Sequence, residues 1–351
     1  MRQVGVNSLK IGDILGKTIY SSSGRILLGK GVRLTPLFIS KLRDLGISIV
    51  YIEDDRFNDV VIEDIIKEEH RREAMLILEK STQAVRLGKN VDGFKLKELV
   101  SKIVEEVMFK KDILVNMMDI RSRDNHIFAH SVNVCVLSTV LGKAMLLDSE
   151  KLETLAIGAL LHDIGYVNCN PELLNNHNLS NEELELLKSH TTLGFEELRK
   201  RKEFSLVVAH IAFQHHENSN GTGYPRGLKE SEIHPLAQIV GIADLYDRLT
   251  SDYSGLKRAM PHEACEVLMG VVGKMFALEP VRIFLKNIAS YPTGVTVRLS
   301  TGEIGVVVDQ NPSLPARPVV RVFDELDYGR NTIKEYNMVE ERTLFITEVL
   351  S

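Results

Sequence analysis

The chain has little that would place it in a membrane or outside the cell. No uninterrupted apolar run reaches the roughly 20 residues of a transmembrane helix, and the N-terminal residues lack the apolar core of a signal peptide. Only three cysteines are present, and none belongs to a Cys-x-x-Cys pair. Unpaired cysteines predict reduced thiols, and therefore a cytoplasmic protein without a membrane span. Cys169 lies near the motif described below, and we interpret it as a small buried hydrophobe.

The chain also lacks a strong excess of charge of either sign. It has 43 Lys and Arg against 48 Asp and Glu, for a net charge of −5. This balance excludes a generic polyanion binder, and no basic stripe indicates a surface for duplex nucleic acid. The hydrophobic content of 44% and the length of 351 residues are typical of a globular protein of about two domains, or three if some are small. Any nucleotide site must therefore be local.

Residues 1–54 are predicted to form a small β-rich accessory module. The pattern over residues 19–28, two apolar segments around a run of serines and a glycine, is typical of a β-hairpin. Thr35 is the expected N-cap of a short helix. The β-branched and aromatic segment 47–52 predicts a closing strand.

Residues 55–111 are predicted to be helical and to link two parts of the chain. We expect one charged helix from about residue 60 to 87, and a second helix with an apolar stripe from Leu96 to Met108. Two interpretations of the stripe remain open. It packs on the following domain, or it forms the seam of a homodimer, because both need the same apolar face.

Residues 112–290 are predicted to be almost wholly helical. The capping box at 180–183 marks the start of a helix that should contain His190. Gly165 is expected to end an earlier helix. The pattern changes over residues 291–351, where apolar and polar residues alternate between turns rich in proline and glycine, which indicates a small β-domain.

Potential metal ligands are concentrated in the helical region. Imidazole and carboxylate groups together suit divalent transition metals, and an aspartate between two metals can bridge them and help generate hydroxide at neutral pH. A phosphodiester is an anionic, poor electrophile, so its hydrolysis benefits from both effects. The candidate ligands are His130, His162, Asp163, His190, His215, His216 and Asp244.

These residues occur in motifs that resemble a known family. His162-Asp163-Ile164-Gly165 resembles the signature of the HD phosphohydrolase superfamily, and HHENSNGTGYP at 215–225 resembles the second signature of its HD-GYP family. The resemblance covers about residues 120–285. It implies a mainly α fold, an all-helical HD-type bundle around a di-metal centre, here flanked by small β-rich N- and C-terminal modules. It also implies iron or manganese as the metal and hydrolysis of cyclic di-GMP.

Carried over residue by residue, the resemblance assigns two metals. One would be held by His130, His162, Asp163 and Asp244, and the second by Asp163 as a bridge with His190, His215 and His216. The loop Gly223, Tyr224 and Pro225 would face the cyclic dinucleotide.

Two neighbouring residues extend this assignment. Asp247, one helical turn after Asp244, is a candidate hydrogen-bond acceptor for a ligand imidazole. His126 lies four residues before His130, on the same helical face. It is either a ligand of a third metal or a histidine outside the metal shell.

The chain departs from the family pattern at Tyr166, where the family has the lysine of HD-x-G-Lys. That lysine is expected to contact the substrate phosphate, whereas tyrosine offers one hydrogen bond and stays neutral at pH 7. Losing a preorganised charge typically costs about 3 kcal/mol, roughly a hundredfold in rate. Arg226, Lys257 and Arg258 are candidate cations for the phosphate or guanine, and solvated surface residues are the alternative for all three.

Three functions remain open. The first is a metal-dependent phosphodiesterase, a bacterial signalling hydrolase that opens cyclic di-GMP to pGpG or GMP with hydroxide held by both metals and Asp163. The second is a receptor that binds cyclic di-GMP while Tyr166 suppresses the chemistry. The third is a hydrolase of a different cyclic dinucleotide.

Overall fold

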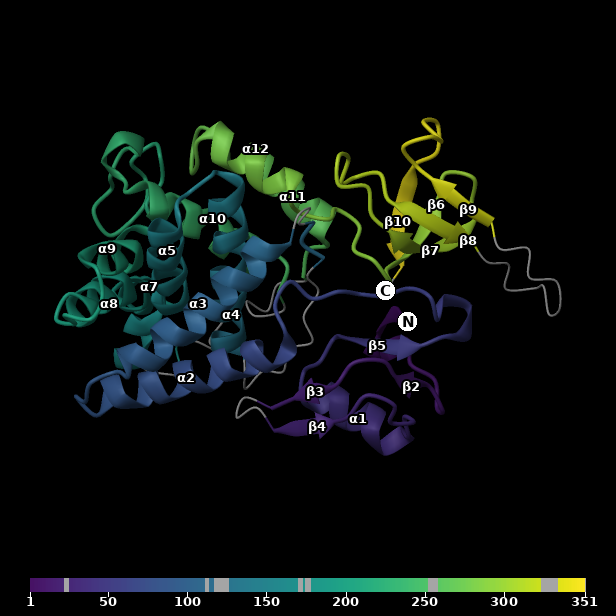
Figure 1. The fold of residues 1–351 in the computed structure, drawn as a ribbon, viewed down its shortest axis with the longest axis horizontal. Helices are drawn as coiled ribbons and strands as arrows, with labels where there is room; N and C mark the ends of the chain where they lie inside the picture. The colour runs from purple at the N-terminus through teal and green to yellow at the C-terminus, as the bar shows by residue number, and fades with distance from the viewer. Residues whose placement is uncertain are drawn as a thin grey trace.

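The computed structural model describes residues 1–21, 25–110, 114–116, 126–169, 173, 178–251, 258–322 and 334–350. The helices between residues 68 and 286 pack into one bundle, and the two β-rich modules at the chain ends lie side by side next to this bundle (Figure 1). The predicted mainly α class, with small β-rich modules at both ends, is confirmed.

The N-terminal module is a small antiparallel sheet covered by one helix. Its sheet has the strand order β1-β5-β2, and a separate hairpin pairs β3 with β4, as predicted over residues 19–28. The Thr35 hydroxyl accepts a hydrogen bond from the Phe38 amide, so the expected N-cap is present. The elements are β1 (Arg2–Gly5), η1 (Val6–Ser8), β2 (Ile14–Leu15), β3 (Ile19–Tyr20), β4 (Ile26–Leu28), α1 (Pro36–Asp44), β5 (Ile49–Glu53) and η2 (Asp55–Phe57).

The segment before the linker helices differs from the prediction. The first linker helix, α2 (Glu68–Arg86), begins eight residues later than expected, and residues 58–67 are not helical. Val60 packs against the C-terminal module in a small core with Val306, whereas Ile65 and Ile66 pack into the main core of the bundle. Tertiary burial therefore overrides the helical pattern at this point.

The second linker helix, α3 (Gly93–Phe109), decides between the two interpretations of the apolar stripe. Its buried residues, from Leu96 to Val107, belong to the main core, and the helix packs on α5 (Ser149–Leu161) and α4 (His126–Ala144). The stripe thus faces the following domain, and it is not available as a dimer seam.

The bundle is built around α4, which is buried on nearly all sides and packs against α5 and α10. Among the described helices α4 alone is long and apolar enough to cross a membrane, but 78% of this stretch is buried inside the protein, as in a core helix. The remaining helices are η4 (Ile164–Asn168), α7 (Asn181–Lys188), α8 (His190–Leu198), α9 (Leu206–Gln214), η5 (Glu230–Glu232), α10 (Pro235–Leu249), α11 (Pro261–Gly270) and α12 (Leu278–Lys286).

Two local predictions in the bundle are wrong. The capping box at Ser180 is present, but its helix ends at Lys188, and His190 begins the next helix, α8. Gly165 does not end α5, because that helix ends at Leu161 and Gly165 lies inside η4. A Cβ at Gly165 would overlap the His190 carbonyl oxygen, so this glycine permits the close approach of η4 and α8.

The C-terminal module is a five-stranded antiparallel sheet that contacts the N-terminal module. Arg321 forms an ion pair with Asp59 at 2.5 Å, and Ile49 is buried in the same small core as Val295. The strand order is β10-β6-β7-β8-β9, with β6 (Thr296–Leu299), β7 (Ile304–Asp309), β8 (Val319–Val322), β9 (Lys334–Asn337) and β10 (Ile346–Leu350).

Candidate metal centre

Asp163 lies at the centre of the predicted ligand set and faces a different pair of histidines with each carboxylate oxygen. Its Oδ1 lies 3.4 Å from His190 Nε2 and 3.6 Å from His215 Nε2. Its Oδ2 lies 3.3 Å from His162 Nε2 and 3.6 Å from His130 Nε2. This is the arrangement that a bridging carboxylate needs.

Asp244 lies on α10 and is the second carboxylate of the predicted ligand set. Its Oδ1 lies 3.0 Å from His130 Nε2 and 3.7 Å from His162 Nε2, while its Oδ2 lies 3.8 Å from His216 Nδ1. The fold therefore brings together all seven residues that the sequence motifs predicted. Five segments supply them: α4, the end of α5, the start of α8, the end of α9, and α10.

The donor atoms fit divalent metal ions. His130 Nε2, His162 Nε2 and Asp163 Oδ1 are buried and make no hydrogen bond within the described chain. Buried polar atoms without partners are costly, and a cation between them would remove that cost. The possible donors fall into two groups within 4.8 Å of one another, His130 with His162 and Asp163, and Asp163 with His190, His215 and His216.

Three of the imidazoles are oriented by backbone carbonyls that lie three residues earlier in the chain. His162 Nδ1 donates to the Ala159 carbonyl at 2.7 Å, and His190 Nδ1 donates to the Leu187 carbonyl at 2.6 Å. His215 Nδ1 likewise donates to the carbonyl three residues earlier, at 2.9 Å. A proton on Nδ1 leaves the Nε2 lone pair directed at the centre, as metal binding requires.

His130 is oriented by side chains instead. Its Nδ1 lies 2.7 Å from Asp247 Oδ2, so Asp247 accepts a hydrogen bond from the imidazole of this candidate ligand, as expected. Asn133 donates to the other Asp247 oxygen at 3.0 Å, and Arg71 from α2 donates to Asn133 at 2.5 Å. A hydrogen-bonded chain thus joins the linker helix to one candidate ligand.

The two sides of Asp163 differ in their protonation. Burial opposes the charged form of His162, but the Asp163 and Asp244 carboxylates outweigh it and raise the His162 pKa to about 10. Burial also opposes the charged form of His130, but the Asp244 and Asp247 carboxylates outweigh it and raise the His130 pKa. On the other side, burial lowers the pKa of His190 to about 3, so this imidazole is neutral at pH 7.

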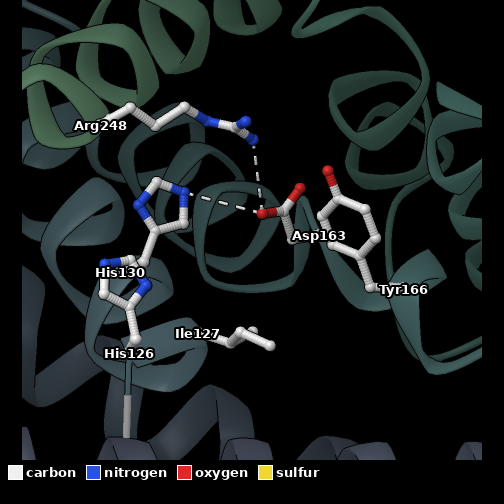
Figure 2. Close-up of a pocket in the computed structure, with 6 residues that line it drawn as sticks. All are labelled: His126, Ile127, His130, Asp163, Tyr166 and Arg248. Carbon is white, nitrogen blue, oxygen red and sulfur yellow. Dashed lines mark ion pairs between the residues drawn. The ribbon is translucent and has the colours of Figure 1, made fainter. Parts of the chain in front are cut away.

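A small pocket opens beside Asp163. Figure 2 shows its lining residues, with the Tyr166 hydroxyl and the Arg248 guanidinium directed toward the same space beside Asp163. The Tyr166 ring stacks on His190, with centroids 4.1 Å apart. Burial and the Asp163 charge raise the Tyr166 pKa well above its ordinary value, so the hydroxyl is neutral. His126 also lines the pocket, and its ring is parallel to that of His130.

The Gly223-Tyr224-Pro225 loop lies next to the candidate ligands. The Tyr224 ring stacks on His216 with centroids 4.7 Å apart. The buried Glu217 carboxylate holds the end of the loop by accepting hydrogen bonds from the Arg226 and Leu228 amides. The side chains of Pro225 and Arg226 are exposed.

Comparisons with known proteins agree with this geometry. Residues 114–275 match the family model described as "HD domain", and residues 296–351 match "KOW domain associated with HD domain". The chain is 31% identical over 264 residues to the cyclic di-GMP phosphodiesterase PA4108 of Pseudomonas aeruginosa, an alignment of 73% of this chain and 64% of that protein. Residues 114–275 therefore form an HD domain of the HD-GYP type.

Two further relatives match the HD-GYP region over a shorter length. A cyclic di-GMP phosphodiesterase of Thermotoga maritima is 34% identical over 184 residues, which are 52% of this chain and 50% of the relative. A 3'3'-cGAMP-specific phosphodiesterase 1 of Vibrio cholerae is 32% identical over 200 residues, 54% of this chain and 46% of the relative. The chain thus spans about half to two thirds of the length of the relatives it matches.

The structure adds residues to the HD-GYP centre that the motifs did not indicate. Arg248 follows Asp244 by one helical turn, and this spacing could have suggested an ion pair between them. No sequence pattern indicated a role for Arg71, because it lies 62 residues from the asparagine that it contacts. Lys257 lies outside the described residues, and Arg258 acts electrostatically on the buried Tyr246.

Proposed function

We propose that this HD-GYP protein is a metal-dependent phosphodiesterase that hydrolyses cyclic di-GMP to pGpG or GMP. The observation that carries the proposal is the position of Asp163, whose two oxygens face separate pairs of buried histidines. Relatives whose names state cyclic di-GMP phosphodiesterase activity support the substrate.

Two divalent ions, iron or manganese, are the proposed cofactors. When bound, such ions lower the pKa of water and neutralise the charge of a phosphodiester. His130, His162, Asp163 and Asp244 would hold one ion, and Asp163, His190, His215 and His216 would hold the other. His126, which is 8% exposed on the pocket wall, is the candidate ligand for a third.

The remaining residues bind and orient the substrate in this proposal. The neutral Tyr166 hydroxyl donates a hydrogen bond to the phosphate. Gly223, Tyr224 and Pro225 face a guanine base, with Tyr224 already fixed against His216. Arg226, Lys257 and Arg258 remain proposed contacts at the edge of the site.

The experiment that tests the proposal measures product formation from a panel of cyclic dinucleotides by the Mn(II)-loaded protein. Cyclic di-GMP is expected to give a linear product faster than cyclic di-AMP or 3'3'-cGAMP. The control is Asp163→Ala, which should give no product. Equal activity of this variant would refute the proposal.

Two alternatives have specific support. Position 166 is a tyrosine and not a lysine, which favours a receptor that binds cyclic di-GMP without turnover. A large gain of rate in Tyr166→Lys would indicate that the missing charge limits the enzyme. The relative named as specific for 3'3'-cGAMP favours that substrate, which the same panel tests.

We also propose a cytoplasmic homodimer that uses residues 60–110. Because the buried stripe of α3 is unavailable, the contact would use the exposed side chains of Phe94, Met108 and Phe109. Sedimentation of the wild-type protein and of Phe109→Ser tests this, and a wild-type monomer would refute it.

A further inference from the structure

Arg248 places a positive charge in the pocket beside Tyr166. It is the only Lys or Arg among the described residues that line this pocket (Figure 2). Its Nε donates to Asp244 Oδ1 at 2.7 Å, and its Nη2 lies 3.7 Å from Asp163 Oδ2. The two buried carboxylates therefore fix the guanidinium at the wall of the candidate metal centre.

The guanidinium keeps donors that these contacts do not use. Arginine has five N–H donors, and the observed contacts engage Nε with Asp244 and Nη2 with His216 Nε2 at 3.4 Å. The Arg248 side chain is 35% exposed, whereas that of Asp163 is 6% exposed. An anion that enters the pocket therefore reaches Arg248, and a planar guanidinium suits phosphate oxygens.

Tyr166 lies across the pocket and carries no charge of its own. Its ring is fixed by stacking on His190, and its hydroxyl feels the opposing charges of Asp163 and Arg248. The HD-GYP pattern has a lysine at this position. In this chain the cation thus comes from α10 rather than from the segment that follows α5.

We propose that Arg248 binds a phosphate oxygen of the substrate and supplies the positive charge that the HD-GYP pattern places at position 166. The inference rests on the proposed function, because it takes a cyclic dinucleotide as the ligand. If so, the pocket retains a positive charge although position 166 is a tyrosine.

The test uses the full chain loaded with Mn(II). Arg248→Gln removes the charge, Arg248→Lys keeps it, and Tyr166→Lys combined with Arg248→Gln returns it to the family position. Binding of inorganic phosphate is measured by calorimetry, Mn content by elemental analysis, and KM and kcat with cyclic di-GMP. Arg282→Gln is the matched control, since Arg282 also pairs with an acid on its own helix but is exposed on α12.

Arg248→Gln is expected to weaken phosphate binding by roughly tenfold or more, with unchanged Mn content. Arg248→Lys should retain most of the affinity, and the double variant should recover most of what Arg248→Gln loses. Tyr166→Lys alone should gain little, because Arg248 already supplies the charge. The control should behave as the wild type.

Two results would overturn the inference. If Arg248→Gln bound phosphate as the wild type does, the guanidinium would not contact the ligand. If it lost Mn, Arg248 would hold the metal ligands in place instead. A wild-type protein that did not hydrolyse cyclic di-GMP would refute the proposed function, while the phosphate titration would still decide the role of Arg248.

Discussion

His130 and His190 flank Asp163 from opposite sides, and different parts of the protein hold them. His190 donates to the Leu187 carbonyl, so its orientation depends on three residues of local backbone. His130 depends on Asp247, which is 117 residues away in the sequence. One side of the centre is therefore set by local structure and the other by the packing of separate helices.

The two sides also differ in charge. His130 lies within 4 Å of Asp163, Asp244 and Asp247, whereas His190 lies near one carboxylate and among other imidazoles. Carboxylates favour harder cations, and imidazoles favour transition metals such as iron. We therefore expect two metal subsites of unequal affinity that respond differently to mutation and to pH.

The largest expected effect is the loss of metal from both sides of the centre. Asp163→Ala deletes the carboxylate whose two oxygens each face one pair of histidines, so metal content should fall at both subsites and turnover should be abolished. Elemental analysis and product chromatography on the same sample measure this. Retention of one tightly bound metal would show that Asp163 does not bridge the two groups.

The next effect separates the two sides. Asp247→Asn should weaken metal binding on the His130 side by about 10- to 100-fold, because it removes the carboxylate that orients that imidazole. The His190 side should be unchanged. A Mn(II) titration should then resolve one weakened and one normal site, with the exposed Asp309→Asn as control. Equal weakening of both sites would contradict the comparison.

The pH dependence should distinguish the sides as well. The His162 pKa of about 10 means that this ring is doubly protonated at pH 7 in the metal-free protein, and the His130 pKa is raised in the same direction, so a metal must displace protons on this side. Metal affinity on this side should therefore rise between pH 6 and 8, by up to about tenfold per pH unit for each proton displaced. The pKa of His190 is about 3, so its protonation does not change in this range. Titrations at three pH values test this, and two equal slopes would contradict it.

The smallest expected effect comes from α2. Arg71→Gln removes the hydrogen bond to Asn133 and should weaken metal binding on the His130 side roughly two- to tenfold, the value of one hydrogen bond. Arg72→Gln is the matched control, because Arg72 is the next residue on the same helix and is exposed. Equal effects of the two changes would mean that the connection to Asn133 does not position the ligand.

The clustering of the candidate ligands could be predicted from the sequence because their motifs are local. The family motifs include two pairs of adjacent residues, His162-Asp163 and His215-His216. Each pair can be recognised without knowledge of the residues around it in the fold. The same holds for helix starts, since Thr35 and Ser180 cap the helices that they were expected to cap. These features depend on a few consecutive residues.

The remaining features depend on contacts between distant residues. The role of Gly165 is set by the His190 backbone 25 residues later, and the non-helical segment 58–67 packs Val60 against the C-terminal module. The hydrogen bonds that link Arg71 to Asp247 through Asn133 join three helices, α2, α4 and α10. No periodicity or spacing in a single sequence encodes such contacts.

The most direct test of the central claim combines two measurements on one sample. Protein purified without oxygen and loaded with Fe(II) or Mn(II) is incubated with cyclic di-GMP, and both linear product and metal per chain are determined. We predict turnover with about two metals per chain, and loss of both in Asp163→Ala. Metal-free protein after loading, or full metal content without any product, would contradict a phosphodiesterase centred on Asp163.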